Sequence, residues 1–160
     1  MTQHERNALI SRFKSGYQEV MNALNGITPE EMDFKISRDK WSCREVIHHL
    51  ADSETTSGLR LRKLLTEFNP YIQGYDEADY AKKLNYAKRP FEPAMEAFKA
   101  ARETTAQLFE FMTDADWKRT GEHSESGPYS AEKWLEVYAA HAHGHADQIR
   151  RNRTKFKEKK

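Results

Sequence analysis

Four long stretches of helical periodicity constrain the fold of this chain more than any other feature. In each stretch apolar side chains recur every three or four residues, which places them on one face of an α-helix. The stretches run over residues 10–24, 46–68, 94–112 and 134–149. No alternation of apolar and polar residues, as in a β-strand, competes over comparable lengths. Four amphipathic helices bury their apolar faces in an antiparallel four-helix bundle, so we expect an all-α fold.

Local signals mark where these helices begin and end. Ser42, followed by Glu45 three residues later, has the capping-box pattern of a helix start. Ser130 is suited to cap the last helix. The pair Asn25-Gly26 ends the first helix, and Asn69-Pro70 ends the second.

The connections between the helices differ in length. Residues 26–41 form a medium loop, and residues 113–130 are polar and turn-prone. Residues 69–92 are too many for a tight turn, so we predict one long crossover between the bundle ends, with a short helix near residues 76–84. No repeat or change of composition divides the chain, and we expect residues 1–160 to form a single domain.

Charge and cysteine content argue against several classes of protein. The net charge is +1, so no global field favours nucleic acid or an anionic membrane. The single cysteine, Cys43, allows no intrachain disulfide, and we expect it to pack as a small apolar side chain. No apolar secretory segment or membrane span is evident, which favours a cytoplasmic location. The basic residues 150–160 are interpreted as a helix end rather than a phosphate-binding arm.

Three histidines lie within five positions, at His141, His143 and His145. At about 100° per residue, His141 and His145 fall within about 40° of each other on the apolar face, whereas His143 points away and is expected to be solvated. Two imidazoles at i and i+4 can share one cation or form a hydrogen-bonded core. The pair alone does not distinguish these alternatives.

A third imidazole would favour a metal, and the second helix offers His48 and His49. His49 lies on the flank of the apolar stripe, where a side chain can reach a neighbouring helix, and His48 lies nearer the opposite side. The helical projection favours His49 without excluding His48. Three neutral imidazoles leave one coordination position open, which is typical of catalytic sites. Zinc suits this ligand set best, and nickel or iron would also fit.

The same residues carry a family resemblance. Trp41-Ser42 opens the second helix, the pair His49-Leu50 follows, and His141 and His145 precede Gln148-Ile149. Over nearly its whole length the chain resembles the DinB-like superfamily, in particular its YfiT-like branch of metal-dependent hydrolases and thiol S-transferases. The resemblance implies a four-helix bundle, often a homodimer, with one divalent metal held by the three histidines.

The resemblance also implies a class of chemistry. The favoured function is a transferase that activates a low-molecular-weight thiol, of the bacillithiol or mycothiol type, for attack on an electrophilic substrate. One alternative is a metal-dependent hydrolase that uses water, and another is a non-catalytic metal-binding protein of a stress response. Hydrolysis usually needs a general base, for which Asp52 and Glu54 are candidates if they are not simply solvated.

Several other side chains are candidates for supporting roles. Gln148, one turn after His145, either hydrogen bonds a ligand imidazole, with a possible part in catalysis, or packs. Arg119 and His123 either hold an anionic group of a thiol cofactor or make surface hydrogen bonds. The tyrosines of the long connection either line a pocket or anchor the loop. They are Tyr71, Tyr75, Tyr80 and Tyr86.

Overall fold

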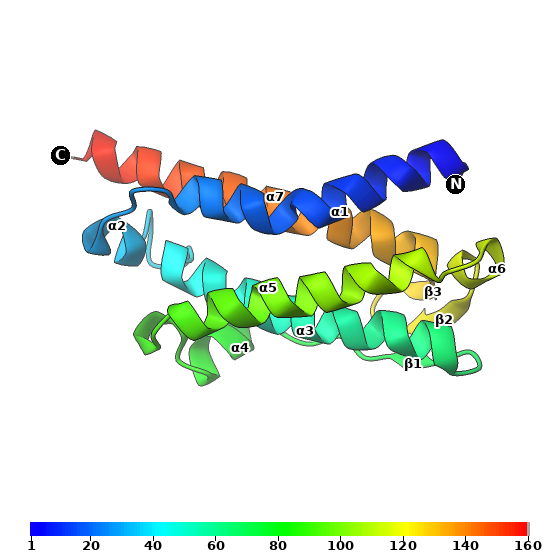
Figure 1. Ribbon diagram of the computed structural model, residues 1–160. Helices are drawn as coiled ribbons and strands as arrows, with labels where there is room; N and C mark the ends of the chain where they lie inside the picture. Colours follow the sequence, from blue (N-terminus) through cyan, green and yellow to red (C-terminus); the bar gives the residue numbers. More distant parts are fainter. Residues whose placement is uncertain (160) are drawn as a thin grey trace.

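The four long helices expected from the sequence are present in the computed structural model, which describes residues 1–159. They are α1 (Gln3–Leu24), α3 (Cys43–Thr66), α5 (Glu92–Ala106) and α7 (Ala131–Glu158). Figure 1 shows α1 beside α7 in one layer and α3 beside α5 in the other. The helices of one layer run opposite to those of the other. The predicted antiparallel four-helix bundle is therefore confirmed.

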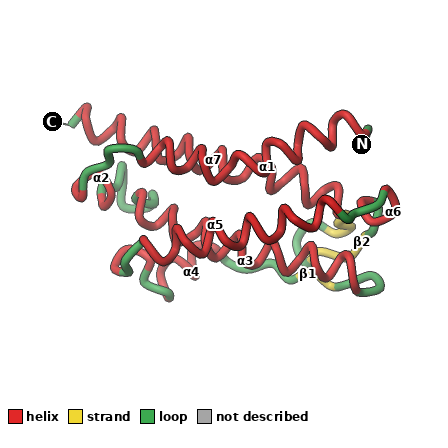
Figure 2. The backbone as a smooth tube through the Cα atoms, viewed as in Figure 1, coloured by secondary structure: helices red, strands yellow, loops and turns green. Residues whose placement is uncertain are grey.

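The long crossover between α3 and α5 is confirmed as well. Figure 2 shows that α3 ends at one end of the bundle and that α5 begins at the other, so the chain returns along the bundle between them. This return explains why α3 and α5 run in the same direction. The connections hold short helical segments. They are α2 (Pro29–Asp33), α4 (Glu77–Lys83), η1 (Tyr86–Lys88), η2 (Gln107–Glu110) and α6 (Asp114–Trp117).

A small three-stranded sheet adds to the predicted helices. β1 (Tyr71–Ile72) pairs in parallel with β2 (Thr120–His123), and β2 pairs antiparallel with β3 (Gly127–Ser130). This sheet was not predicted from the sequence, although the short helix that is present as α4 was. Such short strands carry no detectable alternation, and one pairing joins segments about fifty residues apart. The sheet ties the crossover to the segment that leads into α7.

The predicted helix caps fix where α3 and α7 begin. The Ser42 hydroxyl accepts a hydrogen bond from the Glu45 amide at 3.3 Å, and the Glu45 carboxylate accepts one from the Ser42 amide at 2.8 Å. The Ser130 hydroxyl accepts from the Lys133 amide at 3.0 Å. Because these caps set the start of each helix, they also set the direction in which every later side chain points.

The apolar core forms two clusters along the bundle. One contains Val46, Phe98 and Ile149, and the other contains Phe13 and Trp134. Most predicted stripe residues lie in one of these clusters, and Cys43 is buried as expected. Phe68 is an exception, since α3 ends at Thr66 and the Phe68 side chain is 99% exposed.

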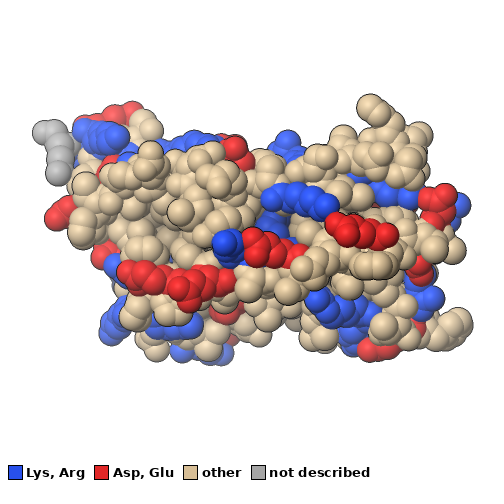
Figure 3. Space-filling view, viewed as in Figure 1, with Lys and Arg blue, Asp and Glu red and all other residues tan. Residues whose placement is uncertain are grey.

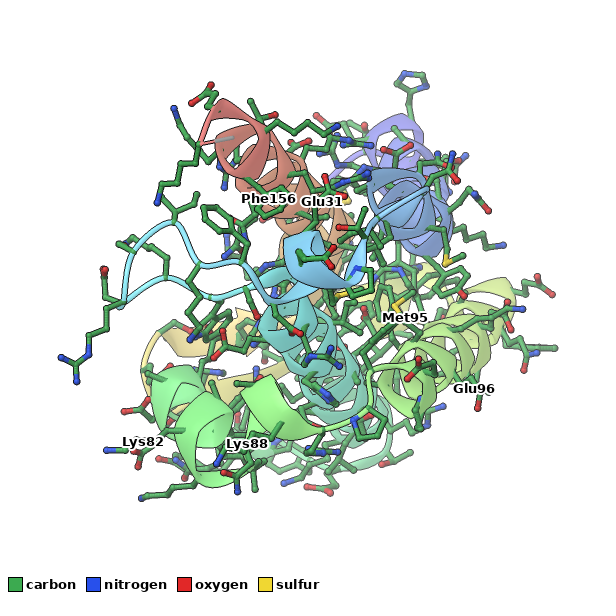
Figure 4. The ribbon with its side chains drawn as sticks, turned by 90° about the vertical axis from the view of Figure 1, so that its left-hand side faces the viewer. Glu31, Lys82, Lys88, Met95, Glu96 and Phe156 are labelled. Atoms are coloured by element: carbon green, nitrogen blue, oxygen red, sulfur yellow. The ribbon has the colours of Figure 1, made fainter. Side chains whose placement is uncertain are left out.

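On the face shown in Figure 3, acidic and basic side chains are interspersed, so neither sign of charge dominates it. Within residues 1–159, no helix combines the length and apolar character needed to cross a bilayer. Residues 150–158 continue α7, as the helix-end interpretation predicts, and the last residue of the basic segment lies outside the described part. Figure 4 shows Glu31 and Phe156 at this end of the bundle, where Arg153 forms an ion pair with Glu31 at 3.4 Å.

Candidate metal centre

Three histidine side chains from two helices meet inside the bundle. His49 comes from α3, and His141 and His145 come from α7. The Nε2 atom of His141 lies 3.2 Å from Nε2 of His49 and 3.2 Å from Nε2 of His145. One ring nitrogen from each residue lies within 4.8 Å of the other two. Among residues 1–159, this is the only group of at least three histidine, cysteine or acidic side chains that converges in this way.

The spacing of the nitrogens suits a shared cation. Zinc–nitrogen bonds of about 2.0–2.1 Å in tetrahedral geometry separate two ligand nitrogens by about 3.3 Å. The 3.2 Å contacts of His141 agree with this value. His49, 1% exposed, is held by Trp41, whose ring centre lies 4.8 Å from its own.

Hydrogen bonding alone accounts poorly for the same contacts. Nδ1 of His145 lies 2.9 Å from Oε1 of Gln148, an oxygen that only accepts, so Nδ1 donates and Nε2 presents its lone pair. Nε2 of His141 would then have to donate its single proton to Nε2 of His145. That proton would not be available for the contact between Nε2 of His141 and Nε2 of His49. A shared cation would account for both contacts of His141. Gln148 is therefore in hydrogen-bond contact with the His145 imidazole, as one of the two sequence alternatives has it.

Burial keeps the three imidazoles neutral. Burial, aided by the charge of His145, lowers the pKa of His49 to about 3. Burial lowers the pKa of His141 to about 2, with further contributions from His145 and His49. Burial also lowers the pKa of His145, against the opposing effect of its hydrogen bond to Gln148. The neutral form of imidazole is the one that binds a metal.

Acidification should destabilise the metal-free protein, because its buried imidazoles resist protonation. In the unfolded chain an imidazole titrates at about pH 6.5. The folded values for His49 and His141 lie far below, at about 3 and about 2. Below about pH 6.5 the unfolded state therefore binds more protons, and each imidazole removes up to about 1.4 kcal/mol of stability per pH unit. Above about pH 6.5 these imidazoles are neutral in both the folded and the unfolded state, so they do not make the free energy of unfolding depend on pH.

Urea unfolding of the metal-free protein between about pH 7.5 and pH 5 measures this loss. A His141→Ala variant should lose less stability over the same interval than wild type, whereas His143→Ala should match wild type. Equal slopes for wild type and His141→Ala would contradict the proposed burial effect.

The other two histidines of interest lie outside the cluster. His48 faces the crossover, where its Nε2 lies 3.3 Å from the Arg89 carbonyl oxygen and its ring stacks on Tyr86. His143 was expected from the sequence to be solvated, and this expectation is wrong. Its Nε2 lies 2.9 Å from the Arg12 carbonyl oxygen, because α1 packs against this side of α7.

The two acidic candidates for a general base have other partners. Asp52 accepts a hydrogen bond from the Tyr86 hydroxyl. Glu54 is 1% exposed and forms a buried ion pair with Arg102, so it is neither a solvated acid nor a member of the histidine group. The described chain therefore brings no carboxylate into the cluster itself.

The two candidates for binding an anionic cofactor group contact other residues. Arg119 donates hydrogen bonds to the carbonyls of Leu64 at 2.6 Å and Glu67 at 2.9 Å, so it caps the end of α3. His123 is buried on β2 with its ring centre 5.2 Å from that of Tyr129. Neither forms a hydrogen bond with the three clustered imidazoles.

Tyr138 adjoins the cluster and Arg60 contacts Tyr138, and neither role was predicted from the sequence. The ring centre of Tyr138 lies 5.8 Å from that of His141, and the Tyr138 hydroxyl accepts a hydrogen bond from Arg60 at 2.9 Å. A signal for Arg60 exists in the sequence. Arg60 follows His49 by eleven residues, and at about 100° per residue the two side chains differ in direction around the α3 axis by only about 20°.

Comparisons with known proteins identify the family of the chain. The sequence profile of the DinB superfamily matches residues 12–149. A protein of Oceanobacillus iheyensis, named as a candidate metal-dependent hydrolase, is 34% identical over 128 residues, which cover 80% of this chain and 74% of that protein. A protein of Geobacillus kaustophilus with the same description is 27% identical over 132 residues, covering 82% of this chain and 74% of that protein.

The fold has a solved counterpart. YfiT from Bacillus subtilis, described as a candidate metal-dependent hydrolase with an unusual four-helix bundle topology, aligns with a TM-score of 0.90 at 23% identity. The alignment covers 98% of this chain and 90% of YfiT. The structural match shows the shared fold, and the profile and sequence matches show the family. The chain belongs to the DinB superfamily.

Proposed function

We propose that His49, His141 and His145 bind one divalent cation, and that the protein is an enzyme that activates a small thiol there for transfer to an electrophile. The observation that carries the proposal is the convergence of three neutral imidazole nitrogens, with His141 at 3.2 Å from both partners. When bound, a divalent cation lowers the pKa of a coordinated thiol or water toward neutrality. Zinc suits three imidazoles best, and nickel and iron share this ligand preference.

The chain's own residues hold the imidazoles in place for this task. Gln148 fixes the proton of His145 on Nδ1, which leaves Nε2 free to bind. Trp41 covers His49, and Tyr138 lies beside His141. These contacts restrict the rings and keep bulk water from them, so the ligand geometry is formed before the cation arrives.

The surroundings of the cluster favour a thiol over water as the nucleophile. A thiol ionises at a pKa of about 8.5 and needs less help from a base than water does. Asp52 and Glu54, the two acids that follow His49 on α3, are engaged by Tyr86 and Arg102. The thiol would come from solution, since burial raises the pKa of Cys43 to about 11 and suppresses its reactivity. A small thiol of the bacillithiol or mycothiol type fits this role.

Hydrolysis is the second candidate, and the description of the relatives favours it. The similar proteins of Oceanobacillus iheyensis and Geobacillus kaustophilus are named as candidate metal-dependent hydrolases. A third candidate is a metal-binding protein without turnover.

A single domain over residues 1–160, a homodimer and a cytoplasmic location also remain predictions.

A parallel assay separates these three candidates. Zinc-loaded, nickel-loaded and metal-stripped protein are incubated with several small thiols and monochlorobimane, and separately with chromogenic esters and amides. We expect metal-dependent conjugation of at least one thiol, with stripped protein at the background rate. Metal-dependent hydrolysis without conjugation would instead establish the second candidate. Full metal content without turnover in either series would favour the third candidate.

A further inference from the structure

Arg60 is a cation with unused hydrogen-bond donors close to the candidate metal centre. Its Nη1 donates to the Tyr138 hydroxyl at 2.9 Å, and its Nη2 donates to the Gln73 carbonyl at 2.8 Å. A guanidinium has five N–H donors, so these two bonds do not exhaust it. The Nε atom is buried and has no hydrogen-bond partner within the described chain.

Tyr138 connects Arg60 to the histidine cluster. The side chain is 4% exposed, its hydroxyl contacts Arg60, and its ring centre lies 5.8 Å from that of His141. One phenol ring therefore separates the guanidinium from a proposed metal ligand. Arg60 is therefore connected to the cluster through this one side chain.

Tyr75 adds a second unused donor at the same place. Its ring lies under Arg60, with the guanidinium carbon 5.9 Å from the ring centre. The Tyr75 hydroxyl is buried next to the Ser53 side chain, which acts to lower its pKa, but it has no hydrogen bond of good geometry among residues 1–159. Burial raises the pKa of Tyr75 to about 12, so the hydroxyl keeps its proton at neutral pH and can donate it.

Unsatisfied polar atoms are concentrated in this region. Four buried side-chain atoms lack a partner in the described chain, and three of them belong to Arg60, Tyr75 and His141. Buried polar groups in folded proteins nearly always have partners, so this region is suited to bind a polar molecule. The donors of Arg60 and Tyr75 require that molecule to supply acceptors.

The charge balance around Arg60 points to an anion. No carboxylate lies within ion-pairing distance of its guanidinium in the described part of the chain. Glu77 on α4 is near enough for Arg60 to oppose the rise that burial causes in its pKa, yet the two do not form an ion pair. A half-buried guanidinium without a counter-ion binds carboxylate or phosphate groups well, because its planar fork matches two of their oxygens.

We propose that Arg60 and Tyr75 form an anion-binding subsite of the metal centre, which receives a carboxylate or phosphate group of the substrate. This inference rests on the proposed function, since the cation would hold the reacting end of the same molecule. It identifies the substrate or cofactor thiol as a small acid and Arg60 as a residue that determines specificity.

Anion titrations test the subsite without an assay of turnover. Inorganic phosphate and sodium acetate are titrated separately into metal-free and zinc-loaded protein, with ionic strength held constant by chloride, and binding is followed by calorimetry. The metal-free arm isolates the subsite from direct binding of the anion to zinc. Comparison of the two anions shows which acidic group the subsite prefers.

Arg60→Gln should weaken binding of the preferred anion by about 10- to 100-fold, because charged hydrogen bonds are lost. Arg62→Gln is the matched control, since Arg62 lies on the same helix but donates to Thr105 on α5. Tyr75→Phe should weaken binding by about fivefold. Tyr71→Phe, at a 56% exposed position of the crossover, should leave it unchanged. Arg60→Lys, which keeps the charge but loses the planar fork, should also bind more weakly than wild type.

Wild-type affinity in both Arg60 variants, or no detectable binding of either anion to wild type, would overturn the subsite. Metal content is measured in every sample, which separates this outcome from failure of the proposed function. If wild type held no zinc while Arg60-dependent anion binding persisted in the metal-free arm, the proposed function would fail and the subsite would stand.

Discussion

His141→Ala should abolish metal binding, reducing the divalent metal in purified protein from about one ion per chain to a trace. His141 is the central residue of the group, since its Nε2 contacts those of His49 and His145 at 3.2 Å. Without it, two imidazoles on different helices remain, and a pair of neutral ligands rarely retains a divalent ion against dilution. Elemental analysis of protein purified without an affinity tag measures the loss.

His143→Ala is the matched control for this experiment. His143 lies on the same helix two residues away, but its Nε2 faces the Arg12 carbonyl oxygen on α1. The control should keep its metal, and both variants should keep the helical circular dichroism spectrum, because the apolar clusters are untouched. Full metal occupancy in folded His141→Ala would reject the assigned ligands and, with them, the proposed function.

Glu54→Ala should lower the free energy of unfolding by about 3–5 kcal/mol, the usual cost of removing one partner of a buried ion pair. Glu54 and Arg102 are 1% and 2% exposed, and their ion pair joins α3 to α5. Arg102 also donates to the carbonyls of Phe13 at 2.8 Å and Tyr138 at 3.0 Å. Glu54→Ala would leave the Arg102 guanidinium buried without an anion. Urea unfolding at neutral pH measures the difference.

Two further variants show whether charge is the cause. Glu103→Ala removes an exposed acid of α5 whose contact with Lys99 is 3.9 Å, and it should cost less than about 0.5 kcal/mol. The double variant Glu54→Leu with Arg102→Met removes both charges and should recover most of the lost stability. A single variant as stable as Glu103→Ala would show that the pair does not hold α3 to α5.

Much of the fold could be predicted from the sequence, because its signals are local. Apolar periodicity predicted the four long helices, and Ser42 and Ser130 predicted two of their starts. The spacing of His141 and His145 placed them on one helix face before any contact was known. The length of residues 69–92 predicted the crossover, and the structure shows that α3 and α5 consequently run in the same direction.

The sequence by itself determined the helices, their ends and the pairing of two histidines on α7, because each depends on residues only a few positions apart. Only the tertiary structure decided that His49 reaches them, that Glu54 is paired with Arg102, and that Arg60 lies beside Tyr138. It also decided the sheet that joins β1 to β2. These features depend on how each helix is rotated and which neighbour it packs against, and that choice is made by the whole core rather than by any local pattern.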